Sequence, residues 1–207
     1  CSPEAMAITL EGLGVDAMGI NCSLGPKEIF PMAERIAKCT TKPLIIKANA
    51  GLPNLETGAY DIDPEMFAQQ MAAYPAIGVT ILGGCCGTTP EYISALKEKL
   101  KDMTPEKRQI VPMSRVCTPT RVVDIDGVRI IGERINPTGK KRFQQALKEQ
   151  DMDYILTQGI TQAEGGAHLL DVNVGLPAID EVAMMKKVVK SLQGVLDLPL
   201  QIDSSNP

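Results

Sequence analysis

Short apolar runs alternate with amphipathic stretches through the first half of the chain. The runs have the length of β-strands and lie at 15–20, 44–48 and 78–82. Their nearly continuous apolar character is typical of parallel strands that are covered on both faces. Apolar residues at helical spacing predict a helix over 27–39, and helices are also expected over 3–12, 64–74 and 90–101. This alternation indicates a parallel α/β fold built from βα units.

Three of these helices are expected to begin with the same signal. An N-cap residue, a proline and a glutamate follow one another at Ser2-Pro3-Glu4, Asp63-Pro64-Glu65 and Thr89-Pro90-Glu91. The cap side chain accepts from an unpaired backbone N–H, and proline has no N–H to leave unpaired in the first turn. The acid suits the positive end of the helix dipole. The signal therefore predicts where each helix starts.

The alternation resumes in the second half. Strands are predicted at 128–135, 168–174 and 198–202, and helices at 140–149, 152–164 and 180–193. The run 121–125 is expected to pair with the strand at 128–135 across Asp126-Gly127, a typical hairpin turn. Residues 104–121 are rich in Pro, Thr, Lys and Arg and lack periodicity, which predicts a linker between a first part, 1–103, and a second part, 122–207.

The length of the chain restricts the architecture. A complete eight-stranded α/β barrel takes about 250 residues, whereas the chain has 207. Three βα units on each side of the linker predict parts of two (β/α)8 TIM-type barrels. Since the first residue is Cys1 rather than Met, we expect the chain to be a segment of a longer protein.

Composition excludes several classes of protein. The chain is 44% hydrophobic with a net charge of −4, which argues against disorder and against a nucleic-acid partner. No run approaches the roughly 18 apolar residues of a membrane span, and no signal peptide is visible. We therefore expect a cytoplasmic protein with no membrane partner. The single histidine, His168, is expected to pack or cap locally.

Reactive side chains follow the predicted strands of the first half. Carboxyl ends of parallel strands meet at one edge, where Cys22, Asn49, Cys85 and Cys86 are expected to converge. Three thiolates suit zinc and leave its fourth position for a substrate. A pair of buried thiols or a redox-active vicinal pair is the alternative. The Asn49 amide oxygen can occupy the open position, or Asn49 is a turn residue.

Polar side chains also follow the strands of the second half: Asn136, Asp171, Asn173 and Asp203. Carboxylates accept hydrogen bonds, and amides both donate and accept them. Asp171 interrupts an apolar run, where a buried charge without a partner is costly. This pattern indicates a binding site rather than solvated carboxylates.

Three motifs of the first half resemble the zinc-dependent homocysteine methyltransferase family. They are Asn21-Cys22-Ser23-Leu24-Gly25-Pro26, Lys47-Ala48-Asn49-Ala50-Gly51-Leu52-Pro53-Asn54 and the highly specific Gly83-Gly84-Cys85-Cys86-Gly87-Thr88-Thr89-Pro90. The resemblance implies that Cys22, Cys85 and Cys86 bind catalytic Zn²⁺. It also implies that Asn49 fills the open zinc position when homocysteine is absent.

Three motifs of the second half resemble the pterin-binding barrel of cobalamin-dependent methionine synthases. That barrel belongs to the pterin-binding superfamily, which also includes dihydropteroate synthase. They are Gly132-Glu133-Arg134-Ile135-Asn136-Pro137-Thr138-Gly139, Leu170-Asp171-Val172-Asn173 and Gln201-Ile202-Asp203-Ser204-Ser205. The resemblance implies that Asn136, Asp171, Asn173 and Asp203 help to seat the pterin.

A homocysteine barrel followed by a folate barrel is the domain order of that family. The resemblance implies methyl transfer from 5-methyltetrahydrofolate, through cobalamin, to zinc-bound homocysteine, giving methionine. Methylcobalamin would be held by a cobalamin-binding domain of the parent protein, so the isolated chain is expected to be inactive. Two alternatives stay open: a non-catalytic zinc-binding or assembly module, and a homocysteine S-methyltransferase with a different methyl donor.

Overall fold

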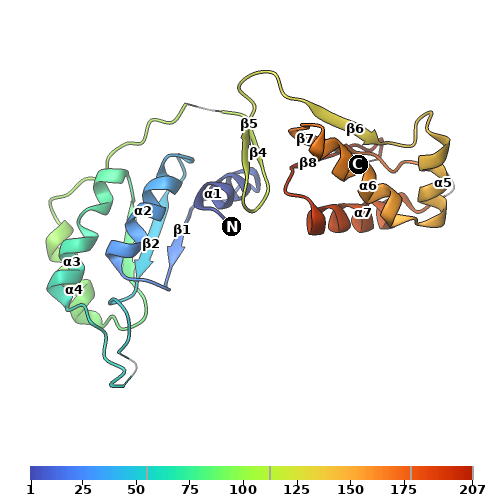
Figure 1. The fold of residues 1–207 in the computed structure, drawn as a ribbon. Helices are drawn as coiled ribbons and strands as arrows, with labels where there is room; N and C mark the ends of the chain where they lie inside the picture. Colours follow the sequence, from blue (N-terminus) through green and yellow to red (C-terminus); the bar gives the residue numbers. More distant parts are fainter. Residues whose placement is uncertain (55, 112, 178, 207) are drawn as a thin grey trace. The chain divides into compact units, whose positions relative to one another are not determined.

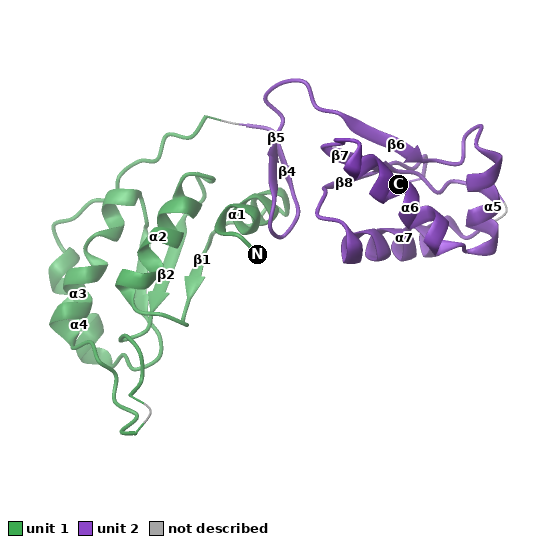
Figure 2. Cartoon of the chain, viewed as in Figure 1, with its two compact units in different colours: residues 1–112 green, residues 113–207 purple. Residues whose placement is uncertain are grey.

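The computed structural model describes residues 1–54, 56–111, 113–177 and 179–206. The chain forms two compact units, residues 1–112 and 113–207 (Figure 2). Both are mixed α/β units with a parallel sheet (Figure 1). Over the ranges just given, no helix has the length and apolar character needed to cross a membrane.

The first unit repeats helix and strand in the predicted order. Its elements are α1 (Pro3–Gly12), β1 (Met18–Asn21), α2 (Pro26–Ala37), β2 (Leu44–Ala48), α3 (Pro64–Met71), the 3-10 helix η1 (Tyr74–Ile77), β3 (Ile81–Gly84) and α4 (Pro90–Leu100). The strands lie in the order β1-β2-β3 and are parallel. Helix α2 packs against β1 and β2, and α4 packs against β3.

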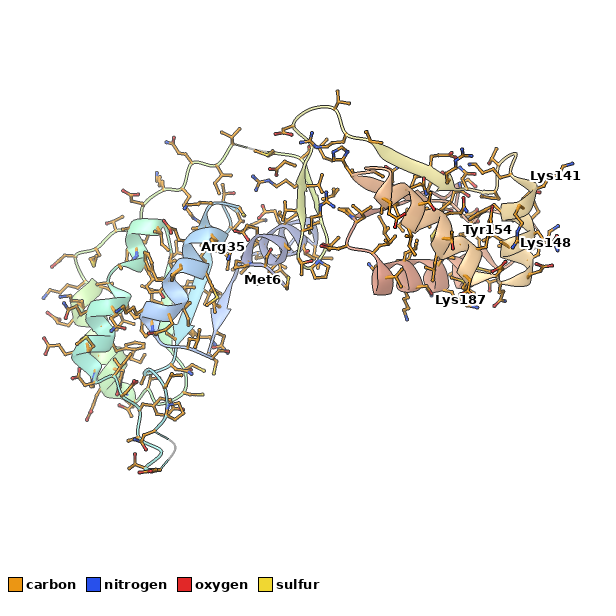
Figure 3. The ribbon with its side chains drawn as sticks, in the orientation of Figure 1. Met6, Arg35, Lys141, Lys148, Tyr154 and Lys187 are labelled. Atoms are coloured by element: carbon orange, nitrogen blue, oxygen red, sulfur yellow. The ribbon has the colours of Figure 1, made fainter. Side chains whose placement is uncertain are left out.

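A continuous apolar core fixes these helices to the sheet. Its largest fully buried side chains are Ile29, Ile36, Leu44, Ile46, Phe67, Met71 and Tyr74. An ion pair joins α1 and α2: Arg35 Nε lies 2.6 Å from Glu4 Oε1. Figure 3 shows Arg35 and Met6 on these two neighbouring helices.

The predicted helix starts are correct, but the predicted caps are only partly so. Ser2 Oγ accepts from the Ala5 N–H at 3.1 Å, and Asp63 Oδ1 accepts from the Met66 N–H at 2.8 Å. Thr89 occupies the N-cap position of α4, yet its side chain makes no capping hydrogen bond. The helix still begins there because Pro90 sets the backbone of its first turn.

The second unit contains a hairpin and a second parallel sheet. Its elements are β4 (Arg115–Cys117), β5 (Val122–Asp124), β6 (Ile131–Ile135), α5 (Lys141–Glu149), α6 (Met152–Glu164), β7 (Leu169–Val172), α7 (Glu181–Val195) and β8 (Leu200–Ile202). The parallel strands lie in the order β6-β7-β8. His168 acts locally, since its Nδ1 accepts from the Ile130 N–H at 2.9 Å.

The predicted pairing of 121–125 with 128–135 is wrong. Strand β5 pairs antiparallel with β4 instead, with Val116 opposite Val123. The turn between them is closed by the Thr118 N–H, which donates to the Arg121 carbonyl at 2.8 Å. Strand β6 pairs with β7, because a parallel partner lets both faces of β6 be covered.

The segment predicted as a linker, 104–121, is packed at both ends. Arg108 Nη1 donates to the Thr40 carbonyl at 2.7 Å, and its other nitrogen donates to the Lys42 carbonyl. Farther along, the Thr120 hydroxyl donates to Asp197 Oδ1 at 2.9 Å, within the second unit. The stretch therefore contacts the first unit through Arg108 and the second unit through Thr120.

We expect Arg108→Ala to destabilise the first unit by about 1.5–3 kcal/mol, the range for hydrogen bonds made by a charged group. Urea unfolding of the full chain measures the change, with the exposed neighbour Lys107→Ala as the control. Equal stability of the Arg108→Ala and Lys107→Ala chains would contradict the packed role of this segment.

Candidate metal centre and acidic pocket

The structure brings the three predicted cysteines together at one edge of the first sheet. Cys22 directly follows β1, and Cys85 and Cys86 directly follow β3. Their sulfur atoms all lie within 4.8 Å of one another, and Cys22 Sγ lies 3.4 Å from Cys86 Sγ. No other group of three metal-ligating His, Cys, Asp or Glu residues occurs in the part of the chain that the structure describes.

This spacing fits one tetrahedral ion. With zinc–sulfur bonds of about 2.3 Å, two sulfurs on the same zinc lie about 3.8 Å apart. The 3.4 Å separation of Cys22 and Cys86 is close to that value and far above the roughly 2.05 Å of a disulfide. The donor set, three thiols and no carboxylate, suits a soft ion such as zinc.

A strained turn aims Cys22 at the other two cysteines. Cys22 and Ser23 have φ angles of 69° and 71°, in the left-handed region that side chains other than glycine rarely occupy. The Cys22 N–H still donates to the Lys47 carbonyl at 2.8 Å, so the chain leaves the sheet immediately afterwards. Such strain is retained when the surrounding structure enforces it and is common at functional sites.

Glycines shape the turn that carries Cys85 and Cys86. A Cβ atom at Gly84 would lie 2.4 Å from Thr88 Oγ1, so a side chain there would collide with Thr88. The Thr88 hydroxyl in turn donates to the Cys85 carbonyl at 2.7 Å. Gly87 has a φ of 79°, which favours glycine. The turn therefore depends on the residues that flank the cysteines.

Asn49 joins the two cysteine segments. It is buried, at 6% exposure, and its Oδ1 accepts from the Cys86 N–H at 3.2 Å. Its own N–H donates to the Leu24 carbonyl at 3.0 Å. The amide oxygen that the sequence assigns to an open metal position thus holds the Cys86 backbone in this structure, and the ligand role stays a prediction.

Cys22 and Cys86 do not ionise equally. A hydrogen bond from the Ser23 backbone, followed by bonds with the Cys86 and Cys85 side chains, lowers the pKa of Cys22 to about 7. Hydrogen bonds with the Cys22 and Cys85 side chains, followed by the charges of those two residues, raise the pKa of Cys86. A thiolate on Cys22 therefore makes ionisation of Cys86 less favourable, and a bound cation would remove this repulsion.

The acidic residues of the second unit form a second cluster. Asn173 Nδ2 donates to Asp203 Oδ2 at 2.8 Å, and Gln201 Nε2 donates to Asp171 Oδ1 at 2.9 Å. Asp171 is 7% exposed. Burial, and then the charges of Asp203 and Glu133, raise the pKa of Asp171.

A cavity of about 620 Å³ lies beside this cluster. Asn173 and Asp203 line it, together with Thr138, Glu181 and Ser204. Asp171 and Asn136 are not among its lining residues: Asp171 lies in β7, and Asn136 Oδ1 accepts from the Thr138 N–H at 2.8 Å. The structure thus places two of the four predicted residues directly at the cavity.

Two residues at these sites were missed by sequence reasoning. Glu181, the first residue of α7, accepts from Ser204 Oγ at 2.7 Å and from Asn206 Nδ2 at 2.8 Å. Tyr60 lies beside the cysteine turn, since a Cβ atom at Gly87 would lie 2.3 Å from Tyr60 Cγ. The only available signal for Tyr60 was its place in the loop that follows Asn49.

Comparison with known proteins agrees with this division. Residues 1–100 match the homocysteine S-methyltransferase family, and residues 132–207 match the family of pterin binding enzymes. The two matches thus fall one on each unit.

Two relatives extend over both segments. The methionine synthase of Mycobacterium tuberculosis is 33% identical over 97% of this chain and 17% of its own length. That of Mycobacterium leprae is 34% identical over 97% of this chain and 18% of its own length. The chain is thus similar to methionine synthases over nearly its whole length, and it spans less than a fifth of the length of these relatives.

We expect Cys22→Ser, Cys85→Ser and Cys86→Ser each to weaken zinc binding by more than the 10–100-fold that is typical of residues that only contact a ligand. Competition with a colorimetric chelator measures the affinity. Cys1→Ser is the control, because Cys1 is exposed and outside the cluster. Wild-type zinc affinity in any of the three variants would show that the substituted cysteine is not a zinc ligand.

Asp171→Asn is expected to stabilise the chain at neutral pH. The pKa of Asp171 is raised in the folded state, so ionised Asp171 destabilises the fold. This loss of stability begins as the pH rises through the unfolded pKa of about 3.9 and is larger at pH 7. Asparagine removes this cost and keeps an oxygen for Gln201. The gain in Tm should be larger at pH 7 than at pH 4.

The exposed Asp153→Asn is the matched control, with little change expected at either pH. A Tm for Asp171→Asn that falls by the same amount at pH 7 and pH 4 would mean that the carboxylate is not strained by burial.

Proposed function

We propose that the chain carries the zinc site and part of the folate site of a methionine synthase. The enzyme would transfer methyl from 5-methyltetrahydrofolate, through cobalamin, to zinc-bound homocysteine and release methionine. The observation that carries the proposal is the convergence of three cysteine sulfurs at one sheet edge. The order of the two family matches along one chain supports it.

We propose the following architecture for the two segments. Each forms about three βα units of a (β/α)8 barrel, the homocysteine part over 1–103 and the pterin part over 122–207. The parallel orders β1-β2-β3 and β6-β7-β8 support this assignment, since barrel strands are parallel neighbours in chain order. In such barrels the reactive residues follow the strands, as Cys22, Cys85 and Asp203 do here.

Cys22, Cys85 and Cys86 would hold the zinc ion, and the ion would supply Lewis acidity toward a fourth sulfur. A free thiol with a pKa of about 8.5 is only a few per cent ionised at pH 7, whereas coordination deprotonates it. Three thiolates and Zn²⁺ carry a net charge of −1, which keeps an added thiolate electron-rich. Asn49 would occupy the remaining position until homocysteine arrives, at the cost of its hydrogen bond to Cys86.

The acidic cluster would bind the pterin. A pterin ring presents N–H and amino donors along one edge, and Asp203 and Asp171 offer acceptors for them. Asn173 orients Asp203 through their 2.8 Å hydrogen bond, and the adjacent cavity of about 620 Å³ is large enough for a folate head group. Asn136 would contribute at the rim, next to Thr138.

Cobalamin would be supplied by another domain of the longer protein. The homocysteine and folate sites lie in separate units, so the methyl group needs a carrier that visits both. Methylcobalamin is such a carrier, and a cobalamin-binding domain is therefore the proposed macromolecular partner.

Homocysteine is expected to change the metal centre directly. In the cobalt-loaded chain, addition of homocysteine should strengthen the thiolate-to-cobalt absorption, because a fourth sulfur replaces a lighter ligand. Methionine, which has no ionisable thiol, is the control ligand. A separate titration follows binding of 5-methyltetrahydrofolate to the wild-type chain and to Asp203→Asn, which should bind more weakly.

The outcomes separate the candidate functions. Metal binding without any response to homocysteine would favour a non-catalytic zinc module. A response to homocysteine without binding of folate would favour a homocysteine S-methyltransferase with another donor.

A further inference from the structure

Glu181 links the start of α7 to the segment that follows β8. Its Oε1 accepts from the Ser204 hydroxyl at 2.7 Å, and its Oε2 accepts from Asn206 Nδ2 at 2.8 Å. The Asn206 N–H also donates to Ser204 Oγ at 3.0 Å, which closes a small polar ring. Both oxygens of the carboxylate thus hold one short segment, residues 204–206, at two points.

The residue directly before this segment is Asp203, a proposed pterin ligand. The Asp203 N–H donates to the Val172 carbonyl at 3.0 Å, which continues the pairing of β8 with β7. Ser204 is the next residue along the chain, so its bond to Glu181 holds the chain on the other side of Asp203. The backbone of Asp203 is therefore held by the sheet before it and by α7 after it.

The carboxylate of Asp203 is oriented separately, by Asn173. The Gly175 N–H donates to Asn173 Oδ1 at 2.8 Å, so the amide nitrogen of Asn173 faces the other way. That nitrogen donates to Asp203 Oδ2 at 2.8 Å. Asp203 Oδ1 accepts no hydrogen bond from the described residues, which leaves it for a ligand in the cavity that Asp203 lines.

Glu181 and Asn173 come close to each other at Gly175. A Cβ atom at position 175 would lie 3.2 Å from Asn173 Oδ1 and 3.6 Å from Glu181 Oε1. All three residues line the same cavity as Asp203. The two supports of Asp203 are therefore neighbours at the cavity, one acting on its carboxylate and the other on the chain that follows it.

We propose that Glu181 is a positioning residue of the folate site: by holding residues 204–206 it fixes the orientation of Asp203 at the cavity. This inference rests on the proposed folate site. A binding group that is fixed before the ligand arrives loses less conformational entropy on binding, which strengthens the affinity. Glu181 acts through Asp203 and needs no contact of its own with the pterin.

The negative charge of Glu181 makes the expected effect distinctive. 5-Methyltetrahydrofolate carries carboxylates on its glutamate, so a negative charge at the cavity opposes its binding by simple electrostatics. If Glu181 acted through its charge alone, neutralising it would strengthen the binding of folate. If it acts as a support for Asp203, the same substitution weakens the binding.

Glu181→Gln in the full chain tests the proposal, because it keeps the size of the side chain and replaces one acceptor oxygen by an amide nitrogen. The glutamine cannot present an oxygen to both Ser204 and Asn206. We expect the Kd for 5-methyltetrahydrofolate to rise by about 10-fold, the scale of one hydrogen bond to a charged group. In the ligand-free chain, hydrogen exchange of the Asp203 amide, followed by NMR, should become faster.

Two further variants serve as controls. Glu164→Gln removes the same charge from an exposed position of the second unit and should change neither folate binding nor exchange of the Asp203 amide. The double variant Glu181→Gln/Asp203→Asn separates positioning from general destabilisation. If Glu181 acts through Asp203, adding Glu181→Gln to Asp203→Asn should weaken folate binding no further.

The outcomes are distinguishable from failure of the proposed function. A wild-type chain that does not bind 5-methyltetrahydrofolate would overturn the folate site itself. Faster exchange of the Asp203 amide in Glu181→Gln would then still support the contact, and unchanged exchange would overturn it. Where the wild type binds, unchanged or tighter binding by Glu181→Gln would overturn only the role of Glu181. An equal further loss in the Asp203→Asn background would overturn it too, since Glu181 would then act independently of Asp203.

Discussion

Parallel pairing of β1, β2 and β3 is the constraint on which the site depends. Asn21 pairs with Lys47 and Ala48 pairs with Gly84, so the three strands end at nearly the same level. The residues that follow, Cys22, Asn49 and Cys85, therefore emerge together although the two cysteines are 63 positions apart in the chain. A shift of register in either pair would separate the sulfurs.

Convergence of the thiols creates an electrostatic conflict that a cation resolves. A hydrogen bond from the Ser23 backbone lowers the pKa of Cys22 to about 7, whereas hydrogen bonds with the Cys22 and Cys85 side chains, and then their charges, raise the pKa of Cys86. Asn49 holds the backbone of Cys86, and the Tyr60 ring lies against the next residue, Gly87. The surroundings thus hold the three sulfurs close together. The second unit differs, since Asp171 is buried and Asp203 faces a cavity suited to a polar organic ligand.

Local signals made much of this predictable from the sequence. Proline and glutamate after an N-cap residue located the starts of three helices, and polar residues after apolar runs located the cysteines and Asp203. The remaining features depend on contacts that are distant in sequence. The β4–β5 hairpin forms in a stretch without clear alternation, and nothing in the composition reveals that Arg108 reaches the Thr40 carbonyl. Tyr60 was missed because its contact with Gly87 spans 27 residues across an irregular loop.

The central claim is that Cys22, Cys85 and Cys86 bind one ion and leave one position open. X-ray absorption at the zinc edge of the zinc-loaded chain tests it directly, because it counts sulfur neighbours at about 2.3 Å. We expect three sulfurs and one oxygen or nitrogen. Two or fewer sulfurs would contradict the claim, and so would four sulfurs in the absence of an added thiol.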